Sequence, residues 1–132
     1  MENKKIETFE DLRVWKKGIE LVKQIYLVTR QSELSKDFGL RDQLRRASVS
    51  IPTNIAVRGA SRREGFERYS RKEYVTFLNI AKGSAGEVRS LLRVALEIGY
   101  LEQQTYTQLY NQVIELSRML SNQIQSINQA PK

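Results

Sequence analysis

The protein has 132 residues, of which 40% are hydrophobic, and its 22 basic and 15 acidic side chains give a formal net charge of +7. It contains neither cysteine nor histidine, which excludes disulfide frameworks, thiolate sites, histidine-based metal sites and a Ser-His-Asp or Cys-His nucleophile. The length predicts a single domain over residues 1–132, and with no apolar run of membrane-spanning length and no signal peptide we expect a cytoplasmic protein that needs no cofactor and no membrane.

The excess positive charge lies in the middle of the sequence. Residues 1–39 carry a net charge of +1, residues 40–93 carry +7 and residues 94–132 carry −1. A localised basic segment is typical of a surface that binds a polyanion. A solvated basic face that only keeps the protein soluble would give the same pattern.

The first predicted helix covers residues 9–30. Thr8, followed by two acidic residues, is typical of a helix N-terminus. Apolar side chains then recur every three or four residues, which predicts one buried face. That face consists of Leu12, Trp15, Ile19, Val22 and Tyr26, widened by Val14, Leu21, Ile25 and Val28. The segment QSELSKDFG breaks the pattern and is predicted to be a loop.

The second predicted helix covers residues 40–63 and contains Pro52. A proline inside a helix removes a main-chain hydrogen bond and costs about 3 kcal/mol. The apolar spacing nevertheless continues through it, along Leu40, Leu44, Ala47, Ile51 and Ile55. We therefore expect the helix to be kinked at Pro52 without ending there, with Ser48 or Ser50 satisfying the freed main-chain groups.

The third predicted helix covers residues 71–98. Ser70 and Glu73 have the spacing of a capping box at its start, and a glycine, typical of a C-terminal cap, follows its last turn. Two glycines in its centre, Gly83 and Gly86, predict that another backbone packs closely against it, because glycine otherwise only weakens a helix. Its apolar face consists of Tyr74, Phe77, Leu78, Ala81, Ala85, Val88, Leu91, Leu92 and Ala95.

The fourth predicted helix covers residues 103–128. Its apolar face consists of Tyr106, Leu109, Val113, Leu116, Leu120, Ile124 and Ile127. Four helices of similar length joined by three short connections predict an all-α fold, an antiparallel up-down-up-down four-helix bundle.

Four stretches, FEDLRVW, LRDQLRRASVSIPTNIA, EGFERYSRKEYVTFLNIAKGSAGEV and LEIGYL, resemble a known family over most of residues 8–127. The family is that of the bacterial four-helix bundle proteins first noticed in intervening sequences of large-subunit ribosomal RNA genes. Its distant relatives are the accessory proteins of diversity-generating retroelements. The resemblance implies a four-helix bundle that assembles into a ring-like homopentamer and has no catalytic activity. It also implies nucleic-acid binding, which in the retroelement relatives takes place beside a reverse transcriptase and its template RNA.

The sequence departs from this family at VRGASRR, residues 57–63. Removing these seven residues restores the family-like stretch NIAEGFERYSRKEY. The insert adds three arginines and no acidic residue. Seven residues are nearly two helical turns, so the insert either extends the second helix with its facing preserved or, through Gly59, forms a loop.

The candidate nucleic-acid-binding residues are nine basic side chains of the second helix, the third helix and their junction: Arg41, Arg45, Arg46, Arg58, Arg62, Arg63, Arg68, Arg71 and Lys72. Arginine forms paired hydrogen bonds with phosphate oxygens, and phosphate contacts carry no sequence specificity. The alternative is that they form ion pairs, for example between Arg46 and Asp42 one turn upstream. Three aromatic residues among them, Phe66, Tyr69 and Tyr74, either stack on single-stranded bases or close the end of the bundle.

Two functions remain open. The sequence favours a non-enzymatic, oligomeric accessory protein that binds RNA or DNA without sequence specificity, with a reverse transcriptase or another protein as a further partner. The alternative is a scaffold for protein interactions with no direct nucleic-acid role. No catalytic residue, metal site or cofactor site is predicted: a carboxylate pair could be drawn from Glu20, Glu73 and Glu87, but Glu73 is better explained as a helix cap.

Overall fold

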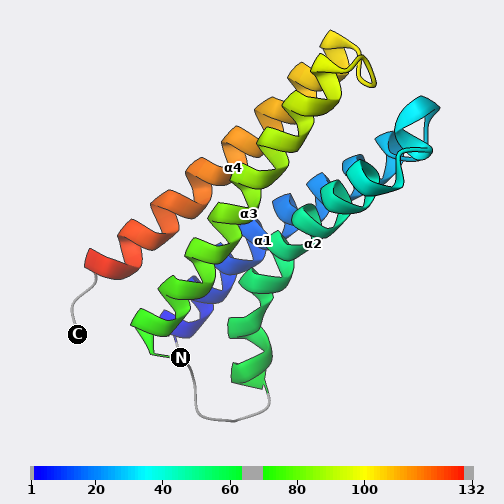
Figure 1. Ribbon diagram of the computed structural model, residues 1–132. Helices are drawn as coiled ribbons and strands as arrows, with labels where there is room; N and C mark the ends of the chain where they lie inside the picture. The colour runs from blue at the N-terminus through cyan, green and yellow to red at the C-terminus, as the bar shows by residue number, and fades with distance from the viewer. Residues whose placement is uncertain (1, 64–69, 130–132) are drawn as a thin grey trace.

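The computed structural model describes residues 2–63 and 70–129, with the backbone alone for residues 2–11 and 57–63. Its elements are α1 (Glu2–Val28), a one-turn 3-10 helix η1 (Ser32–Ser35), α2 (Phe38–Arg63), α3 (Arg71–Glu97) and α4 (Gln103–Gln129). These described residues form no strand (Figure 1). The predicted all-α fold is therefore confirmed.

The four long helices form a bundle in which α1 packs against α2, α2 against α3, α3 against α4, and α4 against α1. The last of these pairs packs least closely. Contacts between α1 and α2 show their relative direction, because Gly18 lies beside Pro52 whereas Tyr26, further along α1, lies under Arg45, which comes earlier in α2. Figure 1 shows the chain reversing its direction at each connection.

The buried faces of α2, α3 and α4 follow the predicted spacing. All five predicted residues of α2 are buried. On α4 the first five predicted residues, from Tyr106 to Leu120, are buried, and Ile124 and Ile127 are partly buried. In α3 the fully buried residues are Tyr74, Leu78, Ala81, Ala85, Val88, Leu92 and Ala95, whereas Phe77 and Leu91 are only partly buried. Helical periodicity thus identified the core on three of the four helices.

The prediction for α1 needs two corrections. The helix begins at Glu2, not at Phe9, because the residues before Thr8 are mostly Glu and Lys, which favour a helix, so Thr8 does not cap it. The buried face of α1 consists of Val14, Gly18, Leu21 and Ile25. The side chains predicted to form the centre of the buried face lie beside the observed one: Leu12 is 44% exposed, and Trp15 and Tyr26 are half-buried.

The connection between α1 and α2 is more ordered than a loop. The one-turn helix η1 buries Leu34 completely. Asp37 then accepts a hydrogen bond from the main-chain N–H of Leu40 at 3.1 Å, which is typical of an N-cap. This cap starts α2 at Phe38, two residues before the predicted start.

Pro52 lies inside α2 and does not end it, and the helix continues through the insert to Arg63. The insert therefore extends the helix and is not a loop. Hydroxyls on both sides of the proline bond to main-chain carbonyls: Ser48 Oγ donates to Arg45 at 3.0 Å and Thr53 Oγ1 donates to Val49 at 3.0 Å. The hydroxyl of Ser48 thus bonds to the carbonyl of Arg45 and not, as we expected, to the main-chain group that Pro52 leaves without a donor. The bend at Pro52 stays a prediction.

Of the predictions for the caps and glycines of α3, those for the caps are confirmed and the one for the central glycines is wrong. The capping box of Ser70 and Glu73 is confirmed, and Gly99 has a φ of 86° directly after the helix, a conformation that glycine adopts readily. Close packing at the centre is wrong within this chain, because a Cβ placed on Gly83 or Gly86 would meet nothing within 4 Å. The close approach occurs at Gly18, where a Cβ would lie 3.4 Å from the ring of Pro52.

Candidate nucleic-acid interface

The nine predicted basic residues do not form one patch. Six of them lie on α2, where Arg41 and Arg63 are 22 positions apart, which corresponds to about 33 Å along a helix. Three of the six lie in the first half of α2 and the other three lie in its last turns. The two groups have different surroundings.

Arg45 joins α2 to the end of α1. Its Nε donates a hydrogen bond to Thr29 Oγ1 at 2.8 Å, and its guanidinium lies 4.5 Å from the centre of the Tyr26 ring. Thr29 is fully buried and donates its hydroxyl to the carbonyl of Ile25 at 2.7 Å. A cation over an aromatic face stabilises the packed state, so Arg45 has a structural role.

Arg41 is also held locally. Its Nε donates to Asp42 Oδ1 at 2.9 Å, its Nη1 donates to the carbonyl of Ser35 at 3.3 Å, and its guanidinium stacks over Phe38 at 4.7 Å. The predicted pair of Arg46 with Asp42 is therefore wrong, because Asp42 pairs with Arg41. Arg46 itself is exposed.

The remaining candidates lie where α2 ends and α3 begins. Arg58, Arg62 and Arg63 belong to the last turns of α2. Arg71 and Lys72 open α3 and are exposed. Arg68 lies outside the described residues, as do two of the proposed stacking aromatics, Phe66 and Tyr69. The third, Tyr74, is 2% exposed and packs in the core, so it is not a stacking residue.

The charges are best grouped by their position along the bundle. Three contacts mark one level near the middle: Gly18 with Pro52, Ser50 with Ser84, and Lys17 with Glu115. On one side of this level lie the start of α1, the end of α2, the start of α3 and the end of α4. We call this part, residues 2–17, 51–63, 70–83 and 117–129, the basic half. The rest of the bundle, residues 18–50 and 84–116, is the neutral half.

The basic half has twelve basic and five acidic residues, whereas the neutral half has eight of each. The whole net charge of +7 thus belongs to one half of the described bundle. Sequence reasoning missed the cations that α1 and the interior of α3 add there, among them Lys4, Lys5, Lys16 and Lys82. The signal that would have found them is the antiparallel pairing, which brings the start of α1 to the end of α2.

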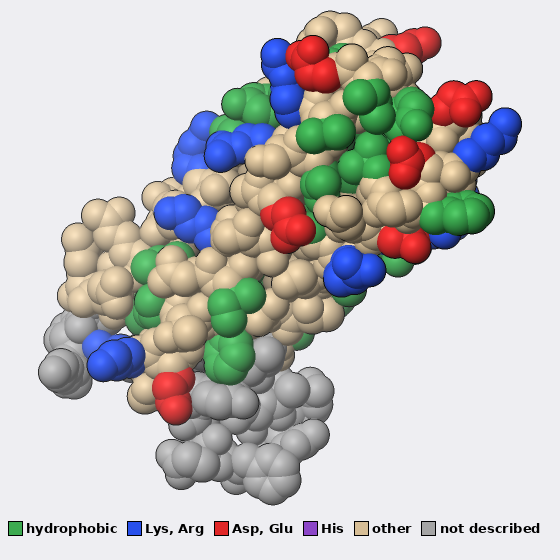
Figure 2. Space-filling model, in the orientation of Figure 1, with side chains coloured by type: hydrophobic (Ala, Val, Ile, Leu, Met, Phe, Trp, Pro, Cys, Tyr) green, Lys and Arg blue, Asp and Glu red, His purple; other side chains and the backbone are tan. Residues whose placement is uncertain are grey.

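Cations of the neutral half that lie close to acidic partners include Arg41, Arg93 and Lys23. Arg93 Nη2 lies 2.8 Å from Glu97 Oε2, and Lys23 Nζ lies 3.7 Å from Glu20. Hydrogen bonding to Tyr106 and the charge of Glu97 raise the pKa of Arg93 further above its ordinary value. Figure 2 shows most of the visible acidic side chains over the end that carries η1 and the connection between α3 and α4. This end has little excess charge with which to attract a polyanion.

Two adjacent arginines allow a direct comparison of the structural and surface roles. We expect Arg45→Ala to lower the free energy of unfolding by about 1–2 kcal/mol, because it removes a hydrogen bond and a cation–π contact. Arg46→Ala is expected to change it by less than about 0.5 kcal/mol, as is usual at an exposed position. Urea denaturation of both variants measures the difference. Equal destabilisation would contradict the role assigned to Arg45.

The part of the chain that the structure describes has neither a metal site nor a membrane-spanning helix. These residues include no cluster of three or more acidic side chains arranged to hold a metal ion. None of the described helices combines the length and the apolar character needed to cross a membrane.

Comparisons with known proteins agree with the fold. A family model described as 23S rRNA-intervening sequence protein matches residues 10–122. No curated protein matches the chain. Among solved structures, the chain is similar to a crystal structure of a protein with unknown function from the S23 ribosomal protein family of Bacteroides thetaiotaomicron VPI-5482. The two chains are 25% identical and superpose with a TM-score of 0.76 over 88% of this chain and 98% of the other. The chain therefore belongs to the 23S rRNA-intervening sequence protein family.

Proposed function

We propose that this protein is a non-enzymatic accessory protein that binds RNA or DNA through phosphate contacts made by the basic half of the bundle. The observation that carries the proposal is the separation of charge, with twelve basic and five acidic residues in one half and eight of each in the other. A surface that concentrates one sign of charge raises the local concentration of a polyanion and speeds its association.

The arginines at the end of α2 are central to this surface. Arg58 and Arg62 are four residues apart on a continuous helix and so share one face of it. Arg71 and Lys72 begin the next helix on the other side of a short connection. Each planar guanidinium offers two parallel N–H groups to a phosphate. Such contacts fix the position of a nucleic acid and do not read its sequence.

A gel-shift titration with RNA and DNA of unrelated sequences tests this function. We expect binding near 50 mM salt, with similar affinity for each sequence. A surface that neutralises six to ten phosphates loses about 10³–10⁵ in affinity between 50 and 200 mM salt. Absence of binding at 50 mM would favour the alternative function, a scaffold that binds only proteins.

We further propose that the protein assembles into a homo-oligomer, which the family resemblance describes as a pentamer. Support comes from the outer face of α3, where Ile80 and Val94 are each about half exposed, as is Ile98 directly after the helix. They lie at helical spacing on the same face as Gly83, over which no other part of the described chain packs. A second copy packing on this face would explain why the centre of α3 contains glycine.

We expect light scattering coupled to gel filtration at micromolar protein to give the mass of a pentamer of the 15.3 kDa chain. Val94→Lys is expected to reduce that mass, because it places a charge on the proposed contact face. Lys replacing Gln43, an exposed residue of α2, is the matched control and is expected to leave the assembly intact. A strictly monomeric mass for the unmodified protein would contradict this part of the proposal.

A further inference from the structure

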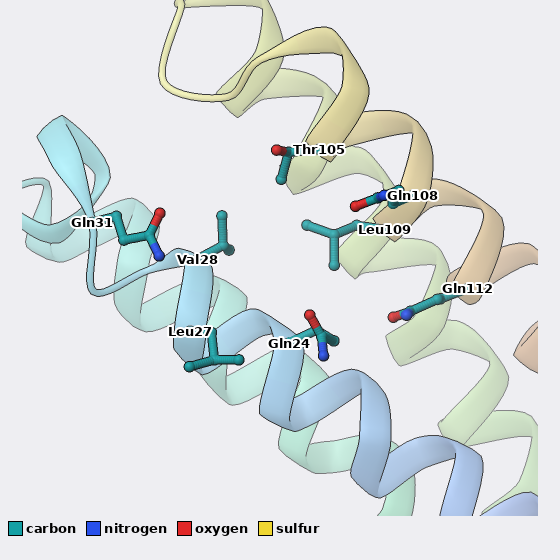
Figure 3. A pocket seen from close by; sticks show the side chains of 8 residues that line it. All are labelled: Gln24, Leu27, Val28, Gln31, Thr105, Gln108, Leu109 and Gln112. Carbon is teal, nitrogen blue, oxygen red and sulfur yellow. The ribbon is translucent and has the colours of Figure 1, made fainter.

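A groove runs between α1 and α4 in the neutral half, and this pair of helices packs least closely of the four neighbouring pairs. Its volume is about 610 Å³, within the usual size range of ligand sites. Figure 3 shows side chains of the two helices facing each other across it. The groove is lined by Gln24, Leu27, Val28, Gln31, Thr105, Gln108, Leu109 and Gln112.

The lining has an unusual chemical composition. Four of the eight side chains are primary amides, one is a hydroxyl, three are aliphatic and none is charged. Gln112 Oε1 is buried, yet it accepts no hydrogen bond from any described residue. Leu27 is 47% exposed at the edge of the groove. Buried polar atoms are nearly always hydrogen-bonded, so an unpaired acceptor beside uncovered apolar surface indicates a site for a molecule that brings both a donor and apolar groups.

We propose that this groove binds an extended, uncharged peptide segment of a partner protein. A primary amide offers both donors and an acceptor, which complements the N–H and C=O of a peptide group. In an extended segment these main-chain groups require partners, whereas a helix pairs them internally. The aliphatic side chains of Val28 and Leu109 then receive an apolar side chain of the segment.

The spacing of the glutamines agrees with an extended chain. Gln108 and Gln112 are four residues apart on α4, which is about 6 Å. Equivalent groups on one side of an extended peptide repeat every two residues, about 6.6 Å. On the other side of the groove, Gln24 lies on α1, where its Nε2 also donates to Glu20 Oε2 at 3.2 Å, and Gln31 lies three residues beyond the end of α1.

A nucleic acid fits this groove less well than a peptide does. No cation lines it, and the one charged residue in the first half of α4 is Glu115. Since phosphate contacts supply most of the affinity for nucleic acids, a site without cations disfavours a nucleic acid. The proposal is independent of nucleic-acid binding in the basic half, and it gives the two halves of the bundle different partners.

Selection from a phage-displayed library of random 12-residue peptides tests the proposal. We expect enriched peptides to be uncharged, to contain an apolar residue and to lose at least tenfold in affinity for a variant carrying Gln24→Ala and Gln112→Ala. Gln43→Ala removes an exposed glutamine of α2 and is expected to leave the affinity unchanged. The proposal is overturned if no peptide is enriched, if the double variant binds the peptides equally well, or if free adenosine or uridine displaces them.

A stability measurement on the unbound protein provides a second test. Gln112→Met keeps the approximate shape of the side chain and removes the unpaired oxygen. We expect it to raise the melting temperature by a few degrees and to abolish binding of the selected peptides. A lower melting temperature would show that the amide of Gln112 holds α4 to α1, and the proposal would then fail.

Discussion

Replacing Arg58, Arg62 and Arg63 together with glutamine is expected to lower the affinity for duplex DNA by about 500-fold at 0.1 M salt. Each phosphate neutralised by a cation contributes about 0.9 to the slope of log K against log salt concentration, so three contacts contribute about 2.7. The difference vanishes near 1 M salt and reaches about 500-fold one decade lower, at 0.1 M. Fluorescence anisotropy with a labelled duplex over a range of salt concentrations measures both the slope and the affinity.

A matched control separates the position of the charge from its amount. Changing Lys23, Arg30 and Lys36 to glutamine removes the same three charges from exposed positions in the neutral half. We expect this variant to keep nearly the original slope. Both variants are expected to remain folded, since glutamine favours a helix about as well as arginine does, and substitutions at the exposed positions of the control change stability little. Equal losses in the two variants would mean that net charge alone governs binding, against the assignment to the basic half.

Gly18→Leu is expected to lower the free energy of unfolding by about 1–3 kcal/mol, because it forces extra volume into a packed contact. A Cβ at this position would already lie 3.4 Å from the ring of Pro52 and 3.6 Å from Ile51 Cγ2. The remaining atoms of leucine have no room unless α1 moves away from α2. Thermal unfolding measures the effect as a decrease in melting temperature of roughly 4 °C per kcal/mol.

Gly18→Ala is the matched control for this contact. Its single added carbon stays at the limit of ordinary packing distance, and alanine favours a helix over glycine by about 1 kcal/mol. We therefore expect unchanged or slightly higher stability. If leucine were tolerated as well as alanine, the close approach of α1 to Pro52 would not be a feature of the folded protein.

The fold was predictable from the sequence because a helix that packs against a core repeats apolar residues at helical spacing within its own sequence. On α2 and α4 one apolar residue per turn faces the core, and these residues were identified correctly. On α1 the buried face contains Gly18, which has no apolar side chain to mark it. The residue that packs against this glycine is Pro52, 34 residues later in the chain, and periodicity within one helix does not report such a contact.

The candidate site was only partly predictable because charge was counted along the sequence. Counting by segments placed Arg41 and Arg45 with Arg58 and Arg62, although the first two are held by contacts with their surroundings. It also left out Lys4 and Lys5, which belong to α1. Only the direction in which each helix runs shows which of its ends meet, and that information depends on tertiary packing.

Chemical acetylation of lysines, with and without bound duplex DNA, most directly tests the claim that nucleic acid binds the basic half. Lysines of both halves serve as reporters, with Lys72 and Lys82 in the basic half and Lys23 and Lys36 in the neutral half. Because all four are exposed in the structure, each is expected to react in the free protein. Mass spectrometry should then show Lys72 and Lys82 protected by DNA, while Lys23 and Lys36 react as before. Protection of Lys23 and Lys36 with continued reaction of Lys72 and Lys82 would contradict the claim.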